Sequence, residues 1–294
     1  MLVNATNLDI RKASKESTPI LSRTFEIEDV WSLHSNYFAI VCIKEGCGTI
    51  ETEMMRSEFI ANTVLCFNTY QAFNLYPSEK TIVTLLLFHA NFFCIETYHH
   101  EVGCNGVLFN NIYSNSSILI PENKIPALKS LMLDIQNEIH EEDLAASELV
   151  FSYLKILLVK LTRLKSGNAY EPSISSAALP PYLENLKILV EENFRIQHKP
   201  AFYANKLNVT VKALSNATSR YYGKPLSSII SEKLVLNAKW TLLHTNTQVK
   251  QIAADLGFAD EYYFSRFFKK HIGLSPKQFR DEEWAMRKGF LSIP

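Results

Sequence analysis

Two stretches near the C-terminus carry polar, cationic and aromatic side chains at spacings suited to contacting DNA bases. In a helix, positions 212, 216 and 219 share one face because they are spaced i, i+4, i+7. The amide of Asn216 suits bidentate pairing with adenine, the guanidinium of Arg266 suits guanine, and the ring of Tyr262 suits contact with a thymine methyl group. We therefore predict a set of base-contacting residues that comprises Lys212, Ser215, Asn216, Glu261, Tyr262 and Arg266.

A second set lies near the ends of the same two stretches, where hydroxyl and cationic side chains are better placed for the DNA backbone. Phosphate contacts fix the register of a protein on the duplex and carry no sequence information directly. We predict phosphate contacts from Ser219, Arg220, Lys269 and Lys270.

Each of the two stretches is preceded by a copy of one short pattern, and the copies lie about fifty residues apart. In the first copy Ala204 precedes Asn208 by four residues, and in the second Ala253 precedes Gly257 by the same interval. Asn and Gly are the residue types that most readily adopt a left-handed backbone conformation. Each copy therefore predicts a short helix that ends in a tight turn.

After each turn comes a helix-capping residue, Thr210 in the first copy and Asp260 in the second. A large apolar residue, Leu214 or Phe264, follows four positions later and would hold the next helix in a core. A short helix, a tight turn and a capped second helix form a helix-turn-helix, whose second helix enters the DNA major groove. The sequence thus predicts two such motifs, with double-stranded DNA as the partner.

A long amphipathic helix is predicted between the two motifs, over about Ser228 to Leu243. About sixteen residues at a rise of 1.5 Å each give a length of about 24 Å. With its flanking turns, this connector would hold the two DNA-contacting helices about 34 Å apart, which is one turn of B-DNA. One chain would then contact two successive major grooves on one face of the duplex.

Further motifs follow in the second copy, where the segment Ile252–Lys270 is succeeded by Gly273-Leu274-Ser275-Pro276 and then by Phe279-Arg280. Together they resemble the C-terminal signature of AraC/XylS-type transcription activators, and the resemblance covers about residues 183 to 280. It implies a DNA-binding unit of seven helices, in which the first DNA-contacting helix usually carries more of the base specificity. This chain departs from the pattern, because residues 211–219 contain no Arg.

The N-terminal half carries many short apolar stretches between about Asn36 and Glu96, separated by Asn, Pro and Ser turns. The run Phe38–Ile43 predicts a buried strand, and such a series of strands favours a sandwich or a small barrel. Resemblance to the effector and dimerisation domains of the same family implies a cupin-like β-barrel followed by helices. The predicted fold class is therefore α+β in two domains, a cupin-like barrel with a helical hairpin and an all-α domain with two helix-turn-helix motifs.

Helices are predicted after the strands, over Ile125–His140 and about Leu144–Leu164. In the second of these helices, five apolar residues recur at spacings of 4, 3, 4 and 3. This pattern suits a helix–helix contact between two subunits. The alternative is one helix packed wholly inside its own domain. The proposed homodimer contact comprises Val150, Leu154, Leu157, Leu161 and Leu164.

Residues 166–181 are rich in Ser, Gly, Asn, Ala and Pro, which predicts a linker between an effector and dimerisation domain at 1–165 and a DNA-binding domain at 182–294. The formal net charge of zero conceals a split between the halves. Residues 1–180 hold 13 basic and 20 acidic side chains, a balance of −7, whereas residues 181–294 hold 17 basic and 10 acidic, a balance of +7. The basic half predicts polyanion binding at one end of the chain.

The N-terminus up to Phe25 lacks an apolar segment of signal-peptide length, and no apolar run is long enough to span a bilayer. We therefore expect a cytoplasmic protein without a membrane partner. Five Cys residues without C-x-x-C spacing are expected to be reduced and mostly buried.

A cupin-type enzyme with an accessory helical domain is the competing function. Metal-dependent cupins need several His and a carboxylate around one ion, whereas this region offers His34 and His89, with His99 and His100 just beyond. We expect no catalytic residue, metal ligand or cofactor. The preferred function is a sequence-specific DNA-binding transcriptional regulator, with activation favoured over repression. RNA polymerase is the expected protein partner if the protein is an activator.

Two questions about the N-terminal half stay open at this point. An interior crowded with Phe side chains fits either a filled core or an apolar pocket for a small-molecule effector. A ligand-independent DNA-binding regulator is therefore the alternative to an effector-responsive one. The Phe residues concerned are Phe38, Phe67, Phe73, Phe88 and Phe92.

Overall fold

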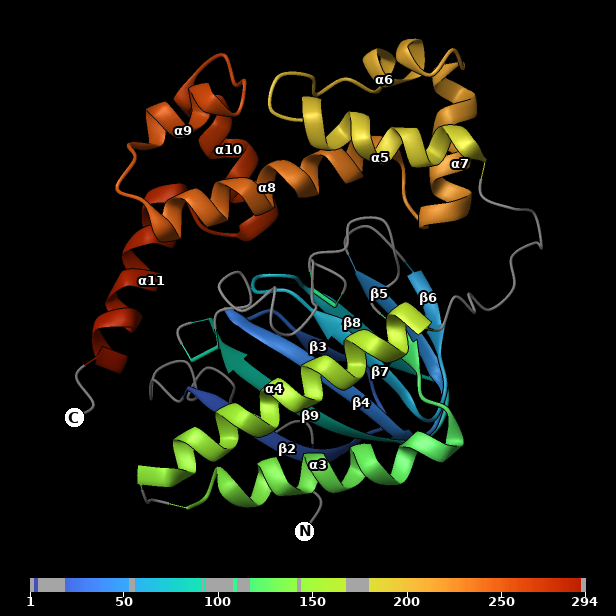
Figure 1. Cartoon of the computed structure of the whole chain (residues 1–294), viewed down its shortest axis with the longest axis vertical. Helices are drawn as coiled ribbons and strands as arrows, with labels where there is room; N and C mark the ends of the chain where they lie inside the picture. Colours follow the sequence, from blue (N-terminus) through green and yellow to red (C-terminus); the bar gives the residue numbers. More distant parts are fainter. Residues whose placement is uncertain are drawn as a thin grey trace. The chain divides into compact units, whose positions relative to one another are not determined.

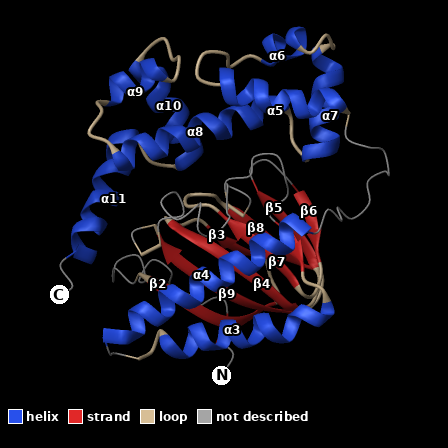
Figure 2. Ribbon diagram, viewed as in Figure 1, coloured by secondary structure: helices blue, strands red, loops and turns tan. Residues whose placement is uncertain are grey.

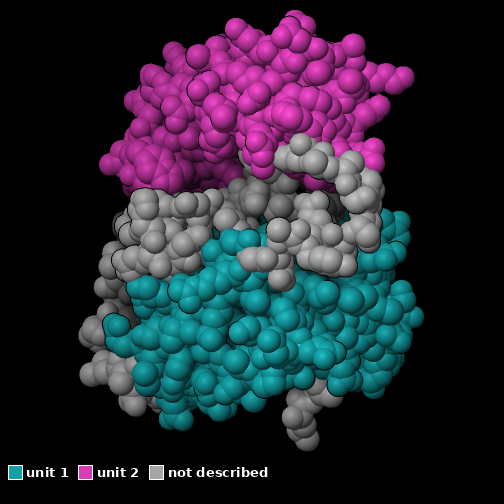
Figure 3. Space-filling model, turned by 45° about the vertical axis from the view of Figure 1, so that its right-hand side comes forward, with its two compact units in different colours: residues 1–111, 116–170, 289–294 teal, residues 112–115, 171–288 magenta. Residues whose placement is uncertain are grey.

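The computed structural model divides the chain into two compact units, drawn in different colours in Figure 3. One unit comprises residues 1–111, 116–170 and 289–294, and the other comprises residues 112–115 and 171–288. The structure describes residues 3–4, 19–52, 56–90, 92–93, 108–109, 117–141, 144–167 and 180–291.

The N-terminal unit contains two β-sheets and two helices, shown by secondary structure in Figure 2. A six-stranded sheet has the order β1-β2-β9-β4-β7-β10, and a four-stranded sheet has the order β3-β8-β5-β6. Apart from the parallel pair β1–β2, the neighbouring strands are antiparallel. The strands are β1 (Val3–Asn4), β2 (Ile20–Ile27), β3 (Trp31–Leu33), β4 (Tyr37–Glu45), β5 (Gly48–Thr52), β6 (Arg56–Phe59), β7 (Thr63–Phe67), β8 (Phe73–Pro77), β9 (Thr81–His89) and β10 (Ser117–Leu119).

The predicted α+β class with two domains is therefore confirmed, although the barrel is not a closed one. Among the described residues no strand pairing joins the two sheets into one hydrogen-bonded cylinder. The predicted strand at Phe38–Ile43 corresponds to β4, and the other strands between β3 and β9 account for the short apolar stretches that follow it.

One apolar core contains side chains from both sheets and is filled with aromatic rings. Phe67 and Phe73 stack with ring centroids 3.7 Å apart, and Trp31 contacts both Phe25 and Phe73. Aromatic side chains bury large apolar areas and add geometric specificity to a core. The described part of this interior is thus a packed core.

The other face of the six-stranded sheet is covered by helices α3 (Ile125–Glu138) and α4 (Leu144–Gly167), preceded by the short 3-10 helix η2 (Glu122–Lys124) (Figure 1). Strand β4 is therefore buried on both faces. Phe38 and Ile40 belong to the core beneath the helices, whereas Ala39 and Val41 belong to the core with the second sheet. Burial on both faces explains why residues 38–43 are continuously apolar rather than alternating.

The five apolar residues of the proposed homodimer contact, which we call the apolar stripe of α4, pack inside their own domain. Four of its five members are buried in the core that α3, α4 and the sheet share, and Leu164 packs against that core. Because these side chains are already covered within one chain, they are not free to form the predicted contact between subunits. The structure thus corrects that assignment in favour of the intradomain alternative, for Val150, Leu154, Leu157 and Leu161.

The three cysteines in the described part of this unit, Cys42, Cys47 and Cys66, are free thiols. Burial raises the pKa of the Cys42 thiol to about 12, so this side chain stays protonated and behaves as a small apolar group. The remaining two, Cys94 and Cys104, lie outside the described residues, as do His99 and His100.

The C-terminal unit is helical throughout its described elements, as the sequence predicts. Helix α11 begins at Pro276 behind Ser275, whose Oγ accepts a hydrogen bond from the Gln278 backbone N–H at 3.3 Å. Most of the predicted linker, residues 168–179, lies outside the described residues. The helices are α5 (Pro181–Asn193), α6 (Pro200–Lys206), α7 (Val211–Tyr222), α8 (Leu226–His244), α9 (Val249–Asp255), α10 (Glu261–Ile272) and α11 (Pro276–Leu291).

None of the helices among the described residues is long and apolar enough to cross a membrane. No group of three or more His, Cys, Asp or Glu side chains in the same part of the chain lies close enough to hold a metal ion.

The assignment of the α4 stripe to the domain core predicts a contrast between two adjacent residues. Leu157 is 1% exposed and Ile156 is 44% exposed. Leu157→Ala should lower the free energy of unfolding by about 2–5 kcal/mol, because it leaves a cavity in a packed core. Ile156→Ala should change it by less than about 1 kcal/mol, because this side chain is half in solvent.

Urea unfolding of the full chain measures both effects. Equal effects of the two substitutions would contradict the assignment. So would a Leu157→Ala protein that becomes monomeric without losing stability.

Candidate DNA-binding site

The first helix-turn-helix consists of α6, a tight turn and α7. Asn208 has φ of 55°, in the left-handed region that the sequence predicts. The N–H of Val209 donates to the Ala204 carbonyl at 3.0 Å, and the N–H of Asn208 donates to the Asn205 carbonyl at 3.2 Å. These two hydrogen bonds satisfy carbonyls that the end of α6 would otherwise leave unpaired, as in a Schellman motif.

The second motif, formed by α9 and α10, repeats this turn bond for bond. Gly257 has φ of 72°. The N–H of Phe258 donates to the Ala253 carbonyl at 2.9 Å, and the N–H of Gly257 donates to the Ala254 carbonyl at 3.0 Å. The buried Ala204 and Ala253 occupy the same position in the two motifs. The repeated pattern in the sequence is therefore a repeated structure.

Each second helix begins at the predicted capping residue. The Oγ1 of Thr210 accepts a hydrogen bond from the Ala213 backbone N–H at 3.1 Å. A carboxylate oxygen of Asp260 accepts one from the Tyr263 N–H at 2.7 Å. Such caps satisfy backbone donors at the helix start and stabilise the helix by about 1 kcal/mol each. They fix the residue at which each DNA-facing helix begins.

Helix α7 separates its side chains into a buried face and an open one. Its buried face consists of Leu214, Ala217, Thr218 and Tyr222. Of the predicted DNA contacts, Ser215 is half-buried, and its carbonyl accepts a hydrogen bond from the Thr218 hydroxyl at 3.1 Å. The others are exposed, namely Lys212, Asn216, Ser219 and Arg220.

Helix α10 buries larger side chains than α7 does, and its exposed face also carries larger side chains. Its buried residues are Phe264, Phe268 and Ile272, and Phe264 contacts the Phe258 ring of the preceding turn at 5.2 Å. Phe267 is half-buried, and its ring contacts those of Phe258 and His271. The exposed residues are Glu261, Tyr262, Arg266, Lys269 and Lys270, and the Tyr262 side chain is 82% exposed.

The exposed cations of the two helices are available to an external anion. Within the described ranges no ion pair engages Lys212, Arg266, Lys269 or Lys270. An unpaired cation on an open helix face keeps its full charge for a phosphate or a base edge. Apart from the half-buried Ser215, the predicted DNA contacts thus lie on exposed faces of two equivalent helices.

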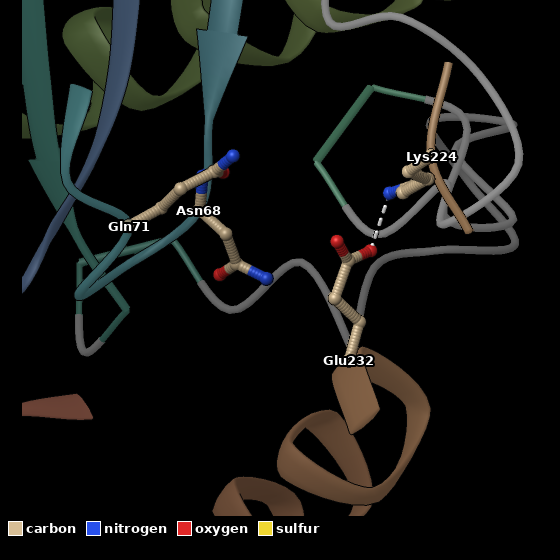
Figure 4. A network of polar contacts seen from close by, with 4 residues as sticks. All are labelled: Asn68, Gln71, Lys224 and Glu232. Atoms are coloured by element: carbon tan, nitrogen blue, oxygen red, sulfur yellow. Dashed lines mark hydrogen bonds and ion pairs between the residues drawn. The ribbon is translucent and has the colours of Figure 1, made fainter. Parts of the chain in front are cut away.

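Lys224 has a different role from these exposed cations. It lies between α7 and α8, is buried, and its ammonium pairs with the Glu232 carboxylate at 2.6 Å (Figure 4). A buried cation is tolerated only when it is paired in this way. This pair fastens the end of the first motif to α8, and sequence analysis missed it because the two residues carry no recognisable motif.

The connector α8 spans 19 residues, three more than predicted, and is about 28 Å long at 1.5 Å per residue. Its C-terminal end is held by Arg280 of α11. The guanidinium donates from Nε to the Leu242 carbonyl at 3.2 Å and from Nη2 to the Thr247 carbonyl at 2.6 Å. Arg280 belongs to the signature that sequence analysis singled out, and the structure gives it a positioning role at the start of the second motif.

Comparison with known proteins matches the same region. A helix-turn-helix domain family model matches residues 203–282. The transcriptional activator AggR of Escherichia coli is 24% identical over 123 residues, which cover 42% of this chain and 46% of AggR. The virulence regulon transcriptional activator VirF of Yersinia enterocolitica is 27% identical over 97 residues, covering 33% of this chain and 36% of VirF. The chain thus spans about half the length of AggR and about a third of VirF.

Other similar proteins match over most of their length, and solved structures match as well. The transcriptional activator RhaS of Escherichia coli O157:H7 is 21% identical over 264 residues, 88% of each chain. A structure of ToxT from Vibrio cholerae is 17% identical, with a TM-score of 0.40, over 90% of this chain and 98% of that one. The C-terminal domain of the response regulator yesN from Fusobacterium nucleatum is 29% identical, with a TM-score of 0.33, over 34% of this chain and 99% of that one.

The family model and the similar activators coincide with the duplicated, capped helix-turn-helix pair that the structure contains. The resemblance to AraC/XylS-type transcriptional regulators is thus confirmed for the helix-turn-helix region, residues 203–282.

Proposed function

We propose that this protein is a sequence-specific DNA-binding transcriptional activator, in which α7 and α10 enter two successive major grooves. One observation carries the proposal: the two helices begin from the same turn and the same type of cap, and each presents exposed polar groups on its open face. A helix-turn-helix docks on DNA through that face of its second helix. The activators similar to this chain support the direction of regulation.

The two helices are proposed to contribute unequally to base recognition. Helix α10 offers the Arg266 guanidinium for guanine and the Tyr262 ring for thymine, and Glu261 is suited to accept from cytosine. Helix α7 offers the Asn216 amide for adenine, with Lys212 beside it. Because α10 carries the larger base-contacting groups, we expect it to supply at least half of the sequence discrimination.

The roles proposed for the N-terminal unit are dimerisation and response to a small molecule. The support is indirect: a DNA-binding module needs neither of the two sheets nor their two cores. A dimer contact would have to use side chains outside the α4 stripe. The exposed apolar residues of the two helices offer such a surface, comprising Leu133, Leu149 and Ile156. A ligand-independent regulator is the alternative.

The remaining partners follow from the proposed function. An activator acts by contacting RNA polymerase, and it meets both polymerase and promoter DNA in the cytoplasm of a bacterial cell. We assign no catalytic residue, metal or cofactor to the chain. A metal titration combined with an activity screen on the full chain tests the competing enzymatic function.

Base contacts and phosphate contacts should be separable by mutation. A good bidentate base contact is worth about 1–3 kcal/mol of discrimination. Arg266→Ala and Asn216→Ala should therefore weaken binding to a duplex selected from a random pool by that amount, and should leave binding to random duplexes nearly unchanged. Lys270→Ala should weaken binding to both duplexes alike, because it removes only a phosphate contact.

The measurement is the affinity of each variant for the two duplexes at one salt concentration. Phe264→Ala is a useful control, since it should lower the melting temperature of the protein through cavity formation rather than change its preference. Equal losses on both duplexes for Arg266→Ala and Asn216→Ala would show that neither residue recognises bases.

The salt dependence of binding should identify the phosphate contacts. Each phosphate neutralised by a cation adds close to one unit to the slope of log affinity against log salt concentration. Lys269→Ala and Lys270→Ala should each reduce that slope by about 1. Lys129→Ala, an exposed cation on α3 of the N-terminal unit, is the matched control and should leave the slope unchanged. Unchanged slopes for Lys269→Ala and Lys270→Ala would remove both residues from the interface.

A further inference from the structure

The two helix-turn-helix motifs are joined by α8, but a second connection between them is visible. Residues 194–199 link α5 to α6, in the first half of the C-terminal unit. Figure 1 shows this link extending toward α9 and α10 before the chain returns to α6. We call residues 194–199 the strut.

The strut contacts the turn of the second motif through a side chain and through the backbone. The Nε2 of His198 lies 2.9 Å from the Leu256 carbonyl oxygen, and its ring lies 5.0 Å from the Phe258 ring. Because a carbonyl oxygen can only accept, Nε2 carries the proton and donates it. At Gly257 a Cβ atom would lie 2.2 Å from the Arg195 carbonyl oxygen, so the two backbones approach too closely for any side chain.

The strut is also fastened to the first half of the unit. The buried Tyr203 of α6 donates its hydroxyl to the Gln197 carbonyl at 2.7 Å. Burial raises the pKa of Tyr203 to about 12, so the phenol keeps the proton that this bond requires. Phe194 is buried at the start of the strut, and Lys233 of α8 lies over its ring while it pairs with Glu191 of α5 at 2.6 Å.

These contacts form a continuous path from α6, through Gln197 and His198, to the turn that precedes α10. A long helix such as α8 is rarely straight, so it does not by itself fix the relative orientation of the two motifs at its ends. A second tie at another point removes that freedom. Two linked binding modules gain most when their separation matches the two sites.

We propose that the strut sets the relative orientation of α7 and α10, with His198 as the positioning residue. The expected effect of the strut on DNA binding rests on the proposed function. The contact itself is independent of DNA and can be tested without it.

The first test measures the distance between the two helices in the full chain. Spin labels are introduced as a non-canonical amino acid at Ser219 of α7 and Lys270 of α10, which leaves the five native cysteines untouched. Double electron–electron resonance should give one narrow distance distribution for the wild type. His198→Ala should broaden or shift it, and His198→Gln, which retains a donor, should restore part of the narrow distribution.

His244→Ala is the matched control. His244 also lies in the C-terminal unit and bonds a backbone carbonyl at 2.9 Å, but that carbonyl belongs to Trp240 of its own helix. This variant should keep the wild-type distribution. If His198→Ala does not fold, His198→Leu replaces it, because Leu fills the space beside Phe258 without donating. A wild-type distribution in the folded Ala or Leu variant would overturn the proposal.

The second test measures how binding depends on the spacing of the two grooves. A duplex selected from a random pool by the full chain is compared with the same duplex carrying two extra base pairs between the two major-groove sites. His198→Ala should lose up to about tenfold in affinity for the selected duplex, the equivalent of one net hydrogen bond. The affinity of His198→Ala should also fall less than that of the wild type when the two base pairs are inserted.

The two tests separate this inference from the proposed function. If the wild type selects no DNA sequence, the proposed function fails, while a distribution broadened by His198→Ala still supports the strut. If the wild type binds DNA specifically and His198→Ala keeps the wild-type dependence on spacing, the strut does not position the two helices on DNA.

Discussion

The left-handed turn at Asn208 and Gly257 is the constraint on which the C-terminal unit depends. One backbone conformation ends the first helix of each motif, satisfies its last carbonyls and turns the chain toward the cap of the next helix. Non-glycine residues pay about 1–2 kcal/mol in this conformation, and Asn is among the few that tolerate it. The placement of α7 and α10 follows from these two residues, because the caps at Thr210 and Asp260 lie only two or three positions further on.

The two turns differ in what surrounds them. Asn208 lies at an exposed turn and keeps its side chain. Gly257 faces the Arg195 backbone, where no side chain fits. The glycine of the second motif therefore serves both the local turn and the contact with the strut, which joins the two motifs into one body.

In the N-terminal unit the corresponding constraint is the six-stranded sheet. Because this sheet is buried on both faces, it needs both the second sheet and the helices α3 and α4 to cover it.

The features that could be predicted from sequence are those that depend on neighbours in the chain. The caps, the turns and the helix that begins at Pro276 each follow from residues within one or two turns of helix, and the structure has all of them. The strand at Phe38–Ile43 was recognisable because burial on both faces leaves a continuous apolar run. What could not be predicted depends on partners distant in sequence. The α4 stripe looked like a subunit contact because periodicity shows that a face is buried but not what buries it. The hydrogen bond from His198 to Leu256 joins residues 58 positions apart, and neither residue type predicts it.

Hydroxyl-radical footprinting of the full chain on its selected duplex tests the central claim most directly, that one chain contacts two successive major grooves through α7 and α10. The account predicts two protected segments on one face of the duplex, with centres about 10 base pairs apart, one turn of B-DNA. It also predicts that Arg266→Ala weakens one segment and Asn216→Ala the other. A single protected segment for the wild type, or two segments on opposite faces of the duplex, would contradict the account.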